Sequence, residues 1–117
     1  MPTPQQVDMA VETLKLLADR TRLRILWALL EGEESVNRLA ERVGAQPAAV
    51  SQHLAKLRLA RLVETRRQGT QVFYLAESDH LRQLVEQALF HADHVLQDLA
   101  HHNHQSERRS ARKGKTA

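Results

Sequence analysis

The stretch VNRLAERVGAQPAAVSQHLAKLRLARLVETRRQGTQVFYL, residues 36–75, decides the fold of this 117-residue chain. Apolar residues at helical spacing predict short helices over residues 36–43 and 47–59. We expect Ser35 to cap the first of these helices, Gly44 to end it and Pro47 to begin the second. Strands over residues 62–66 and 71–75, with a glycine-bearing tip at 67–70, predict a hairpin. Two helices joined by a tight turn and followed by a hairpin are typical of a winged helix-turn-helix.

On either side of this stretch the sequence predicts further helices. Helical spacing indicates helices over residues 7–17 and 21–30, with Asp19 as the N-cap of the second and Gly32 at its end. From residue 77 to about residue 100 one apolar stripe runs along a long helix and needs a partner to cover it. Residues beyond 101 are polar and basic, so we expect them to be mobile. The predicted fold class is therefore mainly α with a two-stranded β-hairpin wing, in one domain over residues 1–105 followed by a flexible basic tail over 106–117.

Composition excludes several classes of protein. No apolar run approaches the roughly 20 residues that cross a bilayer, and the first residues lack the basic and apolar regions of a signal peptide, so we expect a cytoplasmic protein. The absence of cysteine excludes disulfides and thiolate metal sites. Residues 106–117 hold five Lys or Arg, and the rest of the chain has 12 basic and 13 acidic residues. Because the chain without this tail is nearly neutral, a DNA-binding surface must be a local basic patch. Residues 52–67 supply such a patch, with five basic residues and a single acidic one, Glu64.

The predicted helix over residues 47–59 carries a candidate DNA-reading face. Small and polar residues lie opposite its apolar side and allow close approach to DNA. Glutamine can pair with adenine edges and lysine suits a phosphate, whereas His53 lies nearer the buried side. The hairpin arginines are placed for backbone or minor-groove contacts. A solvated charged surface is the alternative interpretation. The candidate DNA-binding residues are Gln46, Ala48, Ser51, Gln52, His53, Lys56, Arg66 and Arg67.

Six of the seven histidines follow the hairpin, and three of them share one flank of the last helix. On an ideal helix His91 lies about 20° round and roughly 16 Å along from His80, and His94 lies one turn beyond His91. A metal ion holds imidazole nitrogens at about 2 Å, so His80 cannot share an ion with the other two within one chain. Two antiparallel copies of the helix would bring them together in two equivalent sites that bridge subunits. Histidines that merely pack or stay solvated are the alternative.

Four segments, LLADRTRLRILWAL (16–29), SVNRLAERVG (35–44), AVSQHLAKLRLARLV (49–63) and RRQGTQVFYL (66–75), together resemble the ArsR/SmtB family of small winged-helix repressors. This resemblance implies a homodimer built from the first and last helices, whose metal-free form binds operator DNA and is released by metal. The family's last-helix site uses an acid two residues before a histidine, and a histidine with a second ligand three residues on. His80, His91 and His94 match this pattern, whereas Ser78 occupies the acid position.

Within this family, the sequence most resembles a branch that senses nickel and cobalt. The similarity rests on AVSQHLAKLR (49–58), on an acid followed by histidine at 93–94 and on the paired histidines 101–102. Several histidines with a carboxylate and no sulfur also suit six-coordinate nickel or cobalt, while zinc would accept four ligands and is the alternative ion. The ligands implied by this branch are His80, Asp93, His94, His101 and His102, with His91 as an additional candidate.

These observations predict a homodimeric transcriptional repressor that leaves its double-stranded operator DNA when nickel or cobalt binds. Two alternatives keep the DNA-binding dimer: control by zinc, or metal-independent binding with structural histidines. A transcriptional activator could share every residue named above. A metal-dependent hydrolase or metal chaperone is disfavoured, because no carboxylate is positioned as a general base and no pocket-forming scaffold remains. We therefore expect a protein that is not an enzyme.

Overall fold

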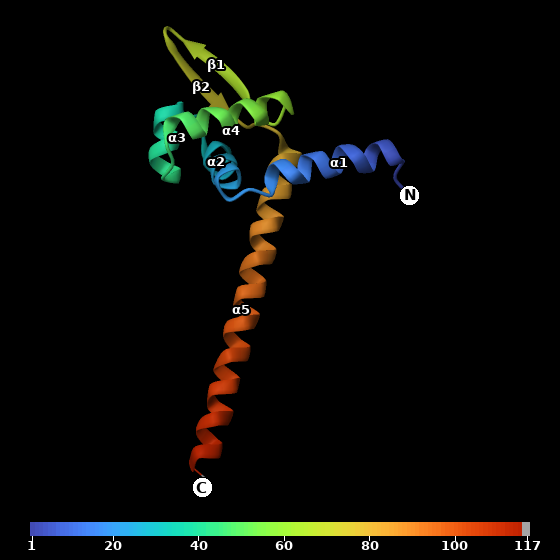
Figure 1. Ribbon diagram of the computed structural model, residues 1–117, viewed down its shortest axis with the longest axis vertical. Helices are drawn as coiled ribbons and strands as arrows, with labels where there is room; N and C mark the ends of the chain where they lie inside the picture. Colours follow the sequence, from blue (N-terminus) through green and yellow to red (C-terminus); the bar gives the residue numbers. More distant parts are fainter. Residues whose placement is uncertain (116–117) are drawn as a thin grey trace. The chain divides into compact units, whose positions relative to one another are not determined.

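The computed structural model describes residues 1–115 and contains five helices and one hairpin within them (Figure 1). In chain order these elements are α1 (Pro4–Leu17), α2 (Arg20–Glu31), α3 (Val36–Val43), α4 (Pro47–Leu59), β1 (Glu64–Gln68), β2 (Gln71–Leu75) and α5 (Asp79–Lys115). Two compact units divide the chain after Val85, within α5. Across the described residues, no helix combines the length and apolarity needed to span a bilayer.

Local capping signals explain where the first helices begin. Asp19 accepts a hydrogen bond from the backbone N–H of Arg22 at 2.9 Å, which starts α2 and holds the pKa of Asp19 below its ordinary value of 3.8. The predicted start of α1 at residue 7 is wrong by three residues. The side chain of Thr3 caps the backbone N–H of Gln6 and the side chain of Gln6 returns the bond, so this capping box starts the helix at Pro4.

The helix-turn-helix has the predicted boundaries. Ser35 caps α3, and Gly44 ends it in the left-handed conformation with φ of 68°. Only three residues, 44–46, separate α3 from α4, whose first residue is Pro47. A glycine in this conformation costs nothing sterically, so the chain can turn sharply here and bring α4 across α3.

A single apolar core holds residues 1–85 together. Helices α2, α3 and α4 contribute most of its buried side chains, and the first turns of α5 add Leu81 and Val85. Each fully buried aliphatic side chain contributes about 1.5–3 kcal/mol through removal from water. By contrast, α1 has no buried residue, although Leu16 and Leu17 at its end pack against the core. The buried residues are Ile25, Leu26, Ala28, Leu29, Leu30, Leu39, Ala40, Val43, Val50, Leu54, Leu57, Val63, Ala76, Leu81 and Val85.

The hairpin forms with a shorter tip than predicted. Gln68 pairs with Gln71, so only Gly69 and Thr70 form the turn, and Gly69 has a φ of 63°. Glycine with positive φ at the first of two loop positions matches the twist of a hairpin. The predicted first strand over residues 62–66 is wrong by two residues, because residues 61–62 still cap the end of α4. The N–H of Leu62 donates to Leu57 O at 2.9 Å and that of Arg61 to Arg58 O at 3.0 Å.

The last helix departs from the prediction at both ends. It begins at Asp79 rather than residue 77, because Ser78 Oγ accepts from the N–H of Leu81 at 3.3 Å and caps it. It also continues to Lys115, well beyond the predicted end near residue 100. Residues 101–113 contain neither proline nor glycine, and seven of these thirteen residues are the good helix formers Gln, Glu, Arg, Ala and Lys. Residues 116–117 of the predicted tail lie outside the described residues.

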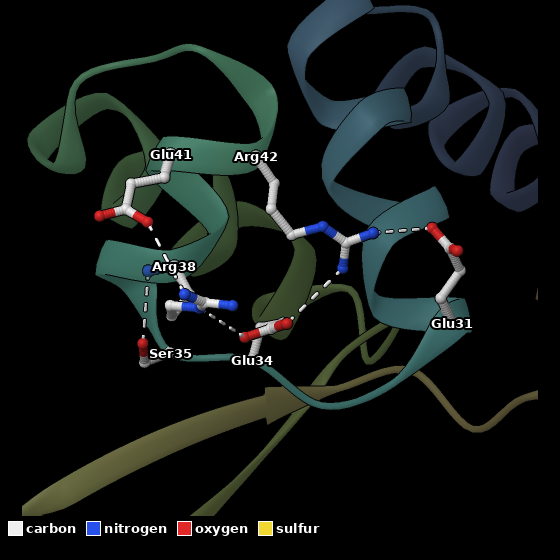
Figure 2. Close-up of polar contacts among 6 residues, drawn as sticks. All are labelled: Glu31, Glu34, Ser35, Arg38, Glu41 and Arg42. Carbon is white, nitrogen blue, oxygen red and sulfur yellow. Dashed lines mark hydrogen bonds and ion pairs between the residues drawn. The ribbon is translucent and has the colours of Figure 1, made fainter.

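Ion pairs connect the end of α2 to α3 (Figure 2). Arg42 binds Glu31 at 2.8 Å and approaches Glu34 at 3.6 Å, so one guanidinium bridges α2 and the segment that leads into α3. Arg38 lies 3.9 Å from both Glu34 and Glu41. Exposed ion pairs contribute little to stability, up to about 1 kcal/mol each. Their main effect here is to orient the first helix of the helix-turn-helix.

Candidate nucleic-acid interface and metal centre

Helix α4 has the amphipathic arrangement that the sequence predicts. Val50, Leu54 and Leu57 are buried. The small and polar positions expected to face DNA are all exposed: Gln46, Ala48, Ser51, Gln52, Ala55 and Lys56. Gln46 precedes the helix and makes no side-chain capping bond. The face that α4 offers to solvent is therefore one that can enter a major groove.

His53 lies at the edge of this face and is half-buried. Its Nδ1 lies 3.3 Å from Nη1 of Arg22, whose Nε donates to the Leu16 carbonyl at 2.7 Å. This arginine thus joins the end of α1 to the middle of α4. His53 therefore has a polar partner in Arg22, at hydrogen-bond distance. The sequence indicated only that His53 lies near the buried side of the helix.

The two hairpin arginines occupy different environments. Arg66 forms a two-pronged ion pair with Glu33, with Nε 3.0 Å from Oε2 and Nη2 bonded to Oε1, and its Nη1 donates to Gln68 Oε1 at 3.3 Å. The guanidinium carbon also lies 5.0 Å from the centre of the Phe73 ring. Arg67 is the next residue of β1, so its side chain emerges on the other face of the hairpin. Arg66 ties the wing to the segment after α2, a contact that the sequence analysis missed.

This ion pair predicts a pH-dependent contribution to stability. The hydrogen bonds from Arg66 hold the pKa of the Glu33 carboxyl below its ordinary value of 4.5. A carboxyl with a lowered folded-state pKa stabilises the fold above its unfolded-state pKa, and loses that contribution as the pH falls through the folded value. We expect Glu33→Gln to lower the Tm at pH 7, and the difference from the unsubstituted protein to shrink as the pH falls below 4.5 and to vanish once it is below the lowered pKa of Glu33.

Thermal unfolding followed by circular dichroism between pH 7 and pH 3 measures this difference. Glu41→Gln is the matched control, because the Glu41 carboxylate lies 3.9 Å from Arg38, which is too far for a hydrogen bond. The control should show no comparable effect. A Glu33→Gln difference that stays constant over the whole range would contradict the assignment.

A shallow groove lies beside the exposed side of α4. It is lined by Ala55, Arg58, Leu59, Arg61 and Tyr74. Arg61 has a φ of 61°, a left-handed conformation that costs a non-glycine residue roughly 1–2 kcal/mol. Leu59 is 86% exposed and lies two turns after Gln52 on the same helix. The sequence placed Arg58 and Arg61 in the basic patch, but only the fold brings them to the edge of the DNA-reading face.

The candidate metal ligands are all exposed on α5. His91 and His94 lie one turn apart, whereas Asp93 lies on another side of the helix, where its Oδ2 accepts from Gln97 Nε2 at 3.1 Å. His101 contacts Gln105 at 3.1 Å. Within the described residues of one chain, no three candidate ligands come together around one point.

The fold and the exposed face of α4 define a winged-helix DNA-binding protein. Residues 19–65 match the model of the family described as "Bacterial regulatory protein, arsR family". The chain is 52% identical over 103 residues to the HTH-type transcriptional regulator KmtR of Mycobacterium tuberculosis, covering 87% of this chain and 79% of that protein. The chain therefore belongs to the ArsR family, and its relatives are transcriptional regulators rather than enzymes, as predicted.

Solved structures show the same fold. The antimony-specific transcriptional repressor AntR superposes with a TM-score of 0.74 at 32% identity, over 81% of this chain and 86% of that one. The homodimeric winged helix-turn-helix DNA-binding domain of Mb0332 from Mycobacterium bovis gives a TM-score of 0.69 at 29% identity, over 80% and 89% of the two chains. The predicted winged-helix fold class is confirmed.

Proposed function

We propose that this protein is a homodimeric repressor that leaves its operator when nickel or cobalt binds to histidines of α5. The observation that carries the metal response is the exposed pair His91 and His94, one turn apart on the last helix of an ArsR-family chain without cysteine. Nitrogen and oxygen donors in such numbers suit six-coordinate nickel or cobalt, and zinc is the second candidate. These donors fit the metals, although no three of them gather in one chain within the described residues.

DNA binding is supported by the face of α4 and the groove beside it. Gln52 and Lys56 lie one turn apart on the exposed side, so one can contact a base edge and the other a phosphate. Arg61 is exposed beside the groove along α4, so its guanidinium is available for a phosphate contact at the edge of the DNA-reading face.

Gln52 and Lys56 of α4 should affect DNA binding in different ways. We expect Gln52→Ala to relax specificity at one base pair, with a loss of about 1–3 kcal/mol on the preferred operator only. Lys56→Ala should weaken binding to all sequences alike, and reduce the slope of log K against log salt by about one. Anisotropy titrations on operator variants at several salt concentrations separate the two effects. Equal losses for both variants on every sequence would contradict the assigned roles.

A dimer is supported by apolar side chains that one chain leaves in water. On α1 they are Val7, Met9, Val11 and Leu14, and on α5 they are Leu84, Leu89, Phe90, Val95, Leu96 and Leu99, all exposed. Exposed apolar residues in such rows on helices mark protein–protein interfaces. A two-fold axis between two copies would cover them and would present two α4 helices to successive major grooves.

The deciding experiment titrates nickel, cobalt and zinc into the protein bound to its own upstream DNA, with affinity followed by fluorescence anisotropy at fixed salt. Metal releases the operator only if it binds the low-affinity conformation more tightly than the DNA-competent one. We expect affinity to fall at about one metal per subunit, with nickel or cobalt more effective than zinc. Unchanged affinity with all three metals would overturn the metal response and leave a metal-independent regulator. Tighter binding with metal would indicate a metal-activated regulator instead.

A further inference from the structure

A carboxylate lies on the histidine flank of α5 that the sequence analysis did not consider. Asp98 Oδ2 is 3.7 Å from His94 Nε2, and both side chains are largely exposed. Asp98 follows His94 by four residues and His91 by seven, so the three lie on one side of the helix in successive turns. In the described part of the chain, Asp98 makes no other polar contact.

The alternative carboxylate, Asp93, is placed differently. It precedes His94 directly and is therefore rotated about 100° from it around the helix. Its Oδ2 already accepts a hydrogen bond from Gln97 Nε2 at 3.1 Å. To bind the same ion as His94, Asp93 would have to give up that bond and the helix would have to distort. Asp98 needs neither change.

The separation of the two atoms also favours a shared ion. At 3.7 Å, His94 Nε2 and Asp98 Oδ2 are too far apart for a hydrogen bond. Two donors that each lie about 2.1 Å from one ion are separated by roughly 3.0–3.4 Å. A small rotation of either side chain therefore allows both to bind one cation. The same four-residue spacing on a helix places the two histidines of H-E-x-x-H on one zinc ion.

We propose that Asp98, rather than Asp93, supplies the carboxylate ligand beside His94 in the metal site. This proposal rests on the proposed metal response. The pair is a half-site, because no three candidate ligands gather in one chain within the described residues. The remaining donors come from a second copy of the chain. A carboxylate next to two or more imidazoles completes the nitrogen and oxygen donor set that nickel and cobalt accept.

Cobalt binding by the full-length dimer tests this assignment. Co²⁺ alone is titrated into the protein, and the visible absorption of the bound ion reports both affinity and coordination. We expect Asp98→Asn to weaken cobalt binding about tenfold or more and to change the spectrum. Asp93→Asn is the matched control and should stay within about twofold of the unsubstituted protein. Metal-free operator binding should be the same for both variants, which shows that both fold.

The outcomes separate this proposal from the metal response itself. Unchanged cobalt affinity in Asp98→Asn, or an equal loss in Asp93→Asn, would overturn the role of Asp98. If replacement of His91 and His94 abolishes cobalt binding while Asp98→Asn retains it, the metal response stands and Asp98 is not a ligand. Failure of the unsubstituted protein to bind cobalt at micromolar concentration would overturn both.

Discussion

Replacing His91 and His94 together with alanine should abolish metal-induced release from the operator. Both side chains are exposed on α5, and neither residue belongs to the buried core or to α4. Their loss therefore removes two imidazole donors without removing a packing contact. We expect metal-free operator affinity to stay within about twofold, as for other surface substitutions. Anisotropy titrations with nickel and cobalt, at the salt concentration used for the unsubstituted protein, measure the response.

His104→Ala is the matched control for this double variant. His104 is also an exposed histidine of α5, but it lies about 80° or more round the helix from His94 and so leaves the histidine flank. The control should retain the full metal response. An unchanged response in the double variant would remove the proposed site, and a response lost equally in His104→Ala would place the metal near the end of α5 instead.

Local signals predicted most of the DNA-binding fold. Ser35, Gly44 and Pro47 mark the ends of α3 and α4, and each acts through hydrogen bonds or backbone angles within a few residues of itself. The helical spacing of the apolar residues then predicted which side of α4 is buried, because residues three or four apart share one side of a helix. The exposed DNA-reading face could therefore be predicted without tertiary information.

Contacts between distant segments could not be predicted in this way. Arg66 is separated from Glu33 by 33 residues, and Arg22 from His53 by 31, so only the assembled core brings each pair together. The extent of α5 was missed for a different reason. Apolar periodicity ends at Leu99, whereas α5 continues to Lys115 through polar residues that this period does not mark. The approach of Asp98 to His94 depends on the rotamers of two exposed side chains, which the helical period does not determine.

Leu96→Glu should convert the proposed dimer to a monomer and weaken operator binding about 100-fold or more, because the two half-sites are then bound independently. Leu96 is 64% exposed in one chain, so the substitution leaves the core intact. Around a two-fold axis it would bury two unpaired carboxylates in an apolar seam. Gln83→Glu adds the same charge on the exposed side of α5 opposite the apolar stripe and should leave both properties unchanged. Sedimentation at micromolar concentration and operator titrations provide the two readouts. A dimer that survives Leu96→Glu with full operator affinity would show that the apolar stripe of α5 is not the interface, and would leave the exposed face of α1 as the surface to test.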